Sequence, residues 1–207
     1  MSLASGTVLM VMDLQNDFCH PDGLYGRSGK GFEHVPAAAS SILPTILEVM
    51  RTCRTLHIPI VATKLLVLTD PSGNAIGVEH FRADLQKLFS TEGFRRDTWG
   101  QEIMNDVLTE VRPDYEVNKW GHSAMYLTEL EKVLRALEAK HLVFTGVATN
   151  GVIEGTGRDA VSRGWAITTL TDCVAAPNPK LHDASLLNLG HIGTTESAAE
   201  FLSRLSS

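Results

Sequence analysis

The stretch HLVFTGVATNGVIEGTGRDA, residues 141–160, passes from a short apolar run through a glycine-containing turn into a helical pattern. The run His141–Gly146 has the length and composition of a buried strand, and the residues after the turn supply the next helix. The turn therefore lies at the carboxyl end of a strand and the amino end of a helix, where backbone N–H groups lack helical partners.

The rest of the chain repeats this alternation. Further strands are predicted at Val8–Gln15, Ile58–Lys64, Asp114–Lys119 and Ala166–Asp172, with a possible last strand near Ile192–Thr195. Helical patterns lie between them, at residues 42–53, 82–89, 101–111, 127–139 and 180–189. Pro44 is awkward in the first of these, so that helix is expected to start late or to kink. The alternation predicts a three-layer α/β/α, Rossmann-like fold with a mainly parallel, doubly wound sheet of about six strands.

Length and composition fit a single domain over residues 1–207, with 43% apolar residues. No run approaches the roughly 18–20 apolar residues of a membrane span, and MSLASGTVLM lacks the pattern of a signal peptide. The net charge of −6 argues against nucleic acid as a partner. The three cysteines (Cys19, Cys53 and Cys173) form neither a disulfide framework nor a CxxC site. A reduced, cytoplasmic setting without a membrane partner is the expectation.

Polar residues stand where three of the predicted strands end. Asp13 follows VLMVM, Lys119 ends DYEVN, and Gly146–Asn150 follows HLVF. Ligands of doubly wound folds sit beyond the carboxyl ends of the strands, so a carboxylate, an ammonium and a group of backbone amides are expected to converge there. The ammonium would hold the carboxylate ionised or supply protons, and the amides would stabilise an oxyanion. Taken singly, Asp13 could instead cap a loop, and Lys119 could be a solvated strand end.

Three segments in this order, VMDLQNDF (residues 11–18), NKWGHSAMYLTEL (residues 118–130) and TGVATNGVIEGTGRDA (residues 145–160), resemble the isochorismatase-like hydrolases, the cysteine hydrolase superfamily. TWGQEI before the third strand, TDCVAA after the fifth, and a histidine-bearing helix near His182 extend the resemblance over nearly the whole chain. The resemblance implies a hydrolase that acts on a small molecule.

The resemblance also implies roles for individual residues. Asp13 takes the place of the family's acid–base aspartate, and Lys119 that of its lysine. The bond between Val147 and Ala148 corresponds to the family's cis peptide, beside an oxyanion hole formed at Ala148 and position 152. The family's nucleophilic cysteine falls on Val152. Thiol amidase chemistry of the nicotinamidase type is therefore in doubt.

Neither Cys19 nor Cys173 is expected to replace that nucleophile. Both follow other strands and would lie away from the helix amino terminus, where amides lower a thiol pKa. No metal and no cofactor are expected. Nicotinamidase-like members carry metal-binding histidines after the second strand, where this chain reads VATKLLVLTD. The eight histidines also lack the spacing of metal ligands. His20 and His122 are expected near the pocket as hydrogen-bonding or substrate-contacting residues.

Substrate contacts are expected from four aromatic residues and a lysine: Phe18, Trp99, Trp120, Tyr126 and Lys64. Lys64 and Lys119 would suit a carboxylated molecule. The long segment between Leu65 and Arg96 is the candidate lid. Gly155 and Gly157 lie in the helix after the fourth strand, where glycine lowers helix stability. Their presence there is therefore expected to serve a close approach of this helix to the sheet or to a second subunit. The resemblance further implies a homo-oligomer, a dimer or tetramer.

Three interpretations of Val152 are open. In the first, the protein hydrolyses its substrate without a cysteine, as true isochorismatases of this superfamily do through their aspartate. Those enzymes have glycine at this position, so valine would narrow the pocket and make isochorismate itself a poor fit. In the second, the chain is a pseudoenzyme that binds a small molecule without turning it over. In the third, valine is an introduced replacement, although alanine or serine would be the usual choice. The first is favoured because Asp13, Lys119 and the GVAT turn are present together.

Overall fold

The computed structural model describes residues 4–29 and 31–205, and its centre is a parallel sheet of six strands. Residues 1–3, 30 and 206–207 of the predicted single domain lie outside the described residues. The strands are β1 (Thr7–Met12), β2 (Ile60–Leu65), β5 (Tyr115–Lys119), β6 (His141–Val147), β7 (Ala166–Ala175) and β8 (Thr194–Glu196). Each predicted strand is present, with ends that differ by a few residues.

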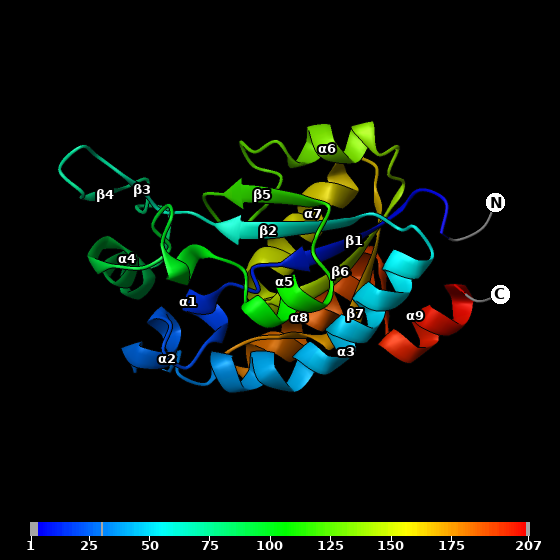
Figure 1. Cartoon of the computed structure of the whole chain (residues 1–207), viewed down its shortest axis with the longest axis horizontal. Coiled ribbons are helices and arrows are strands. Elements are labelled where there is room, and N and C mark those ends of the chain that lie inside the picture. Colours follow the sequence, from blue (N-terminus) through cyan, green and yellow to red (C-terminus); the bar gives the residue numbers. More distant parts are fainter. Residues whose placement is uncertain (1–3, 30, 206–207) are drawn as a thin grey trace.

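The strands lie in the order β5-β2-β1-β6-β7-β8, and every neighbouring pair is parallel (Figure 1). Along the chain, β2 and β5 are thus added on one side of β1, and β6, β7 and β8 are then added on its other side. The order reverses between β1 and β6, and a crevice opens beyond the carboxyl ends of strands at such a point. The predicted doubly wound α/β fold is confirmed, and it places Asp13 and the turn after β6 side by side.

Helices cover both faces of the sheet. Leu9 and Val11 face one apolar core with the helices α3 (Val35–Thr55), α5 (Asn105–Glu110) and α9 (Ala198–Leu205). The intervening Val8, Met10 and Met12 face a second core with α6 (Leu130–Ala136), α7 (Glu154–Ser162) and α8 (Pro179–Ile192). This alternation follows from the two-residue period of a strand, and because both faces are covered, β1 is apolar from Val8 to Met12. Among the described residues, no helix combines the length and apolar character that crossing a bilayer requires.

A cap of short elements lies beyond the carboxyl ends of the strands, at the left of Figure 1. It contains α1 (Asn16–Cys19), α2 (Leu24–Ser28), the hairpin of β3 (Leu68–Thr69) and β4 (Ala75–Ile76), α4 (Ala83–Thr91) and the 3₁₀ turn η1 (Trp99–Gln101). A third apolar cluster joins these elements through aromatic residues such as Tyr25, Phe81 and Phe94. Asp17 connects two segments of the cap. Its buried carboxylate accepts hydrogen bonds from the N–H groups of Leu24 (3.0 Å) and Phe94 (2.7 Å).

Several local details differ from the prediction. Helix α3 begins at Val35 and passes through Pro44, so it does not start late. Its apolar face, which includes Ile46 and Met50, is buried against the sheet and holds the helix in place despite the proline. The predicted helix at residues 101–111 is divided between η1 and the shorter α5, and helices α1, α2 and α9 were not predicted.

Two glycines allow the close approaches that bring β6 and α7 into position. Gly146 has a φ of +112°, and a Cβ there would lie 2.0 Å from the carbonyl oxygen of Met12 in β1. A Cβ on Gly157 would meet side-chain atoms of Leu189 at 2.9 Å and Ile167 at 3.2 Å. Gly157 therefore lets α7 pack closely on the sheet and on α8, as predicted. Side chains at either position would push apart elements that carry the site.

Candidate active site at the carboxyl ends of the strands

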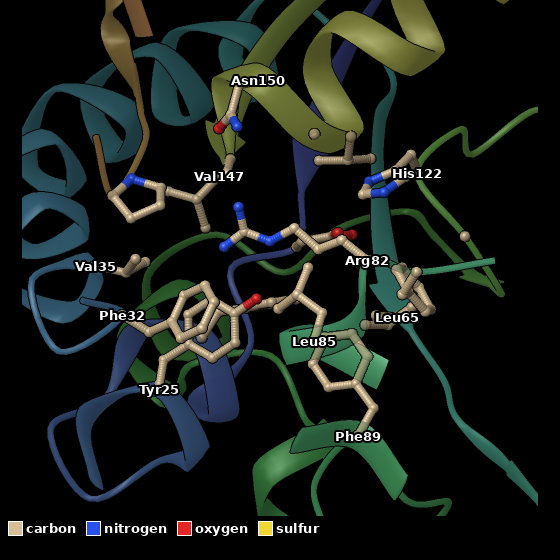
Figure 2. Close-up of a pocket in the computed structure, with 18 of the residues that line it drawn as sticks. Tyr25, Phe32, Val35, Leu65, Arg82, Leu85, Phe89, His122, Val147 and Asn150 are labelled. Atoms are coloured by element: carbon tan, nitrogen blue, oxygen red, sulfur yellow. The ribbon is translucent and has the colours of Figure 1, made fainter. Parts of the chain in front are cut away.

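A cavity of about 380 Å³ opens at the predicted crevice (Figure 2). Its floor is formed by Asp13 after β1, Lys119 at the end of β5, and the turn after β6. Its walls come from the cap and from the amino end of α8. The lining comprises Asp13, Phe18, Tyr25, Phe32, Val35, Leu65, Phe81, Arg82, Leu85, Phe89, Lys119, Gly121, His122, Val147, Ala148, Asn150, Gly151, Val152, Pro177, Asn178 and Leu181.

Asp13 and Lys119 form a buried ion pair on the floor of the cavity. Lys119 Nζ lies 2.7 Å from Asp13 Oδ2, and the two side chains are 4% and 3% exposed, respectively. Thr63 Oγ1, from β2, donates a hydrogen bond of 2.7 Å to Asp13 Oδ1, and Lys119 Nζ donates one of 2.9 Å to the carbonyl oxygen of Gly121. Side chains from three adjacent strands thus fix the orientation of one carboxyl group.

Burial raises the pKa of Asp13 above the usual value of an aspartate, and the ion pair with Lys119 and the hydrogen bonds to it only partly offset this effect. The carboxyl group therefore takes up a proton at a pH where an exposed aspartate would be ionised. Asp13 has a φ of +55°, a left-handed conformation that aspartate and asparagine adopt more readily than most residues. This conformation ends β1 and turns the chain away from the sheet.

The turn after β6 forms the opposite side of the floor. The peptide bond between Val147 and Ala148 is cis. A short π-helical segment, Thr149–Ile153, follows and leads into α7, and the N–H of Gly151 donates to the Ala148 carbonyl at 2.9 Å. Val152 lines the cavity and is 3% exposed. The residue at the position predicted for a nucleophile thus presents an apolar side chain to the site.

The aromatic walls differ from those expected. Phe18 lines the cavity, as predicted, and packs edge-on against Tyr25 with ring centroids 4.8 Å apart. The other aromatic side chains of the lining come from the cap, and they are Tyr25, Phe32, Phe81 and Phe89. Part of the candidate lid between Leu65 and Arg96 thus supplies one wall of the site.

Four of the predicted substrate contacts lie outside this lining. Trp99 is 50% exposed and packs edge-on against His20, and Tyr126 is 62% exposed. Trp120 donates its indole N–H to the Leu127 carbonyl at 3.0 Å. Lys64 forms an ion pair of 2.7 Å with Glu116. Neighbouring residues of a strand point to opposite faces, so Lys64 and Trp120 turn away from the side to which Thr63 and Lys119 point.

The two histidines expected near the pocket have different positions. His122 lines the cavity beside Lys119, whereas His20 contacts Trp99 outside the lining. Desolvation and the charge of Lys119 lower the pKa of His122, so this imidazole is neutral near pH 7. Across residues 4–29 and 31–205, no group of three or more histidine, cysteine or acidic side chains is placed to hold a metal ion. The absence of a resident metal stays a prediction.

The cysteines are unsuited to act as nucleophiles. All three are buried, and none belongs to the cavity lining. Burial raises the pKa of each thiol, that of Cys53 to about 12. The reactive form of a cysteine is the thiolate, so these side chains are held in their unreactive state.

We therefore expect the native protein to resist thiol reagents. At pH 8, Ellman's reagent should modify none of the cysteines within minutes in buffer and all three in guanidinium chloride, measured at 412 nm. The protein in denaturant is the matched control, because the same thiols then have ordinary pKa values. Rapid reaction of one thiol in the folded protein, identified by peptide mapping, would contradict the burial of that cysteine.

Several residues of the site were not predicted from the sequence. Thr63 had a detectable signal, since it is a polar residue near the carboxyl end of an apolar strand. Asn178 follows the fifth strand and precedes Pro179, the pattern of a helix N-cap, and its side chain accepts from the N–H groups of Lys180 and Leu181. Tyr25 lies in a segment without a periodic pattern, and Arg82 begins the predicted helix at residues 82–89. Nothing in the sequence indicated that these two residues share a cavity.

Comparisons with known proteins agree with the observed fold. The family model of the isochorismatase domain matches residues 7–200. A probable inactive nicotinamidase of Arabidopsis thaliana is 28% identical over 188 residues, which cover 90% of this chain and 89% of that protein. The ureidoacrylate amidohydrolase RutB of Caulobacter vibrioides is 28% identical over 207 residues, with 91% and 88% covered. The crystal structure of a cysteine hydrolase from Pseudomonas syringae pv. phaseolicola has a TM-score of 0.77 at 21% identity, with 98% and 93% covered, and supports the fold.

Proposed function

The chain belongs to the isochorismatase domain family of hydrolases, and from this premise we propose that it hydrolyses a small molecule by acid–base catalysis without a cysteine nucleophile. Asp13 is the general acid, and Lys119 positions it and tunes its protonation. The substrate occupies the cavity above Val152, which is a wall of the site and takes no part in the chemistry. The single observation that carries the proposal is the buried, doubly hydrogen-bonded carboxyl group of Asp13 on the floor of this cavity.

The environment of Asp13 suits a proton donor. A general acid must hold its proton near the working pH and must face the substrate. Burial raises the pKa of Asp13 toward that range, and the fixed contacts with Thr63 and Lys119 keep the carboxyl group at the cavity floor. Because Lys119 also donates to the Gly121 carbonyl, its ammonium stays in place when the charge of Asp13 changes during the reaction.

The proposed reaction consumes one water molecule and regenerates the acid. Asp13 donates its proton to the substrate, so that the electron-poor carbon next to the scissile bond becomes open to attack. Water then adds to that carbon and loses a proton, which returns to Asp13 as the bond to the leaving group breaks. With a carbonyl substrate, the proton from Asp13 would go to the leaving group as water adds, and backbone N–H groups at Ala148 and Val152 would stabilise the negative charge on the carbonyl oxygen. No covalent intermediate with the protein is formed.

A binding role without turnover is the second candidate. The observation that favours it is Val152 at the position where the family resemblance places the nucleophile, together with the similarity to a relative named as a probable inactive nicotinamidase. In this alternative the same cavity holds the ligand, and the Asp13–Lys119 pair serves only to stabilise the fold. The two candidates differ in one measurable respect, which is whether a bound molecule is consumed.

The proposed function predicts turnover by the unaltered protein. We expect it to hydrolyse at least one member of a panel of small carboxamides, ureides, esters and vinyl ethers, followed by mass spectrometry in water enriched in ¹⁸O. One ¹⁸O atom should enter the product, because water is the nucleophile. A matched Val152→Cys variant tests the alternative, since activity confined to that variant would show an intact amidase scaffold whose own role is binding.

A further inference from the structure

We propose that Arg82 and Tyr25 form a carboxylate-binding pair in the cavity wall, so that the ligand is a small carboxylic acid with a flat apolar body. This inference rests on the proposed function in one respect, because it takes the cavity above Asp13 as the substrate site. A guanidinium and a phenol from distant parts of the cap face the same space. The phenol has no protein partner among the described residues, and the guanidinium pairs through Nε with Asp84, which lies outside the lining.

Tyr25 is a buried residue whose hydroxyl group is accessible from the cavity and has no protein partner among the described residues. The residue is 7% exposed, and its ring is fixed between Phe18 and Phe32, with centroid distances of 4.8 Å and 4.7 Å. In Figure 2 the hydroxyl oxygen of Tyr25 points into the cavity. Among residues 4–29 and 31–205, no side chain or backbone group forms a hydrogen bond with this hydroxyl. A buried phenol of this kind ordinarily has a partner, and a ligand atom would provide it.

Arg82 extends over the cavity from the amino end of α4. Its Nε atom lies 2.8 Å from Asp84 Oδ1, and its Cζ atom lies 5.6 Å from the centre of the Phe32 ring. Figure 2 shows the guanidinium group directed into the space between Val147 and Tyr25. The Arg82 side chain is 61% exposed and lies at the edge of the cavity, with Asp84 at its Nε atom and the Phe32 ring beside its guanidinium group. The two terminal nitrogens are directed toward the space that a ligand would fill, in the fork geometry that matches a carboxylate.

The charges around the cavity favour an anion at this place. The charged side chains of the lining are Asp13, Lys119 and Arg82, so the lining carries a net positive charge. Lys119 is engaged by Asp13, and Lys64, the other lysine considered for this role, pairs with Glu116 outside the lining. Arg82 also has a carboxylate partner, Asp84, but contacts it through Nε, and its terminal nitrogens are directed into the cavity, so it is the cation of the described lining best placed to receive a ligand carboxylate.

The protonation state of Tyr25 fits the same role. Burial raises the pKa of the Tyr25 hydroxyl above its usual range, and the nearby charge of Arg82 offsets this only in part. The phenol thus stays protonated and acts as a donor to an anion. Since Tyr25 and Arg82 both donate, a carboxylate that accepts from both would be held with its two oxygens in a fixed direction.

The remaining walls define the body of the ligand. Apolar side chains surround the space between the donor pair and the floor, and they include Phe18, Phe81, Leu85 and Phe89. A flat ring or conjugated chain would bury its faces against them. One end of the ligand would carry the carboxylate near Arg82, and the reacting bond would lie near Asp13.

The test compares acids with neutral molecules of the same shape. Benzoate, cinnamate and nicotinate would be titrated into the protein by isothermal calorimetry beside benzamide, cinnamamide and nicotinamide, with mass spectrometry to show that the probes remain intact. We expect at least one acid to bind 10-fold or more tightly than its amide. Arg82→Gln should weaken binding of that acid by roughly 10- to 100-fold, and Tyr25→Phe by roughly 3- to 10-fold, as expected for hydrogen bonds to a charged group. Binding of the amide should change less than two-fold in either variant.

Matched controls separate charge recognition from damage to the fold. Arg96→Gln removes an exposed arginine of the same segment outside the lining, and Tyr126→Phe removes an exposed phenol; neither should change acid binding. Arg82→Lys keeps the charge without the fork and should recover part of the lost affinity. Equal binding of acids and amides, absence of binding by every acid, or parallel loss of acid and amide affinity in Arg82→Gln would overturn the inference.

The outcome is distinguishable from a failure of the proposed function. Selective acid binding that depends on Arg82 and Tyr25, with no turnover of any substrate, would support the ligand class and contradict the hydrolytic role of Asp13. Turnover that depends on Asp13 but is indifferent to Arg82→Gln would support the hydrolase and contradict the carboxylate site.

Discussion

Asp13→Asn should lower kcat about 10³-fold, within the range of 10²–10⁴ that general acid–base catalysis contributes, while ligand binding is retained. Asparagine has nearly the same shape, adopts the left-handed conformation of Asp13 and can still accept from Thr63 Oγ1. The variant therefore removes the transferable proton with little change of shape, and it also leaves the buried Lys119 ammonium without its counter-ion. Steady-state kinetics with the substrate found in the panel, and calorimetric titration of the same acids, measure the two effects separately.

The role of Asp13 as a general acid also determines how activity should change with pH. The pKa of Asp13 lies above 3.8 because of burial, and a general acid acts in its protonated form. Activity should therefore be greatest at low pH, within the limits of stability, and should fall as pH rises through the raised pKa. A rate that increases with pH over this range would show that Asp13 acts as a base instead.

Glu116→Gln is the matched control for this substitution. It also exchanges a carboxylate paired with a lysine for an amide, but Glu116 and Lys64 lie outside the cavity lining and are partly exposed. We expect less than a three-fold change in kcat, in keeping with the weak contribution of such pairs. If Asp13→Asn is as active as Glu116→Gln, Asp13 has no catalytic role and the binding alternative gains support.

The fold could be predicted because its signals are local. Each central strand is a short apolar run, and each ends where a polar residue begins, as β1 does at Asp13. The same rule located part of the floor of the site, since Asp13 and the turn at Val147 follow apolar runs, whereas Lys119 was located as the last residue of the predicted strand DYEVNK. Strand alternation would also have excluded Lys64 and Trp120 as substrate contacts. Each directly follows a residue of the site, Thr63 or Lys119, and successive side chains of a strand point to opposite faces.

The walls of the cavity could not be predicted in this way. Tyr25 and Arg82 lie far apart in the sequence, one in the short helix α2 and the other at the start of α4. They meet because the cap is organised by tertiary contacts, such as the Asp17 carboxylate that joins Leu24 to Phe94. Trp99 and Tyr126 were predicted as substrate contacts because they are aromatic, but aromatic character does not distinguish an exposed side chain from one that lines a cavity. The shape of the ligand site thus depends on long-range packing rather than on local pattern.

Lys119→Met should destabilise the protein by about 3–5 kcal/mol, the usual effect of removing one partner of a buried ion pair. This corresponds to a fall in Tm of about 6–20 °C for a chain of this size. The methionine fills much of the space of the lysine stem, so the loss comes from the Asp13 carboxylate, which remains buried without its counter-ion. Differential scanning calorimetry and urea unfolding measure the change, and Lys64→Met, at the partly exposed pair with Glu116, should cost less than about 1 kcal/mol.

The pH dependence and a double variant identify the cause of this loss. Without Lys119 the folded-state pKa of Asp13 should rise further above its unfolded value of 3.8, so the folded protein binds the extra proton as pH falls. The deficit should therefore be large above the folded-state pKa and shrink as pH falls toward the unfolded-state value. Asp13→Asn combined with Lys119→Met removes both charges and should be more stable than Lys119→Met alone at pH 7. If the double variant is the less stable of the two, then the lysine acts through packing and its bond to the Gly121 carbonyl, and the Asp13 carboxylate is not the charge that Lys119 neutralises.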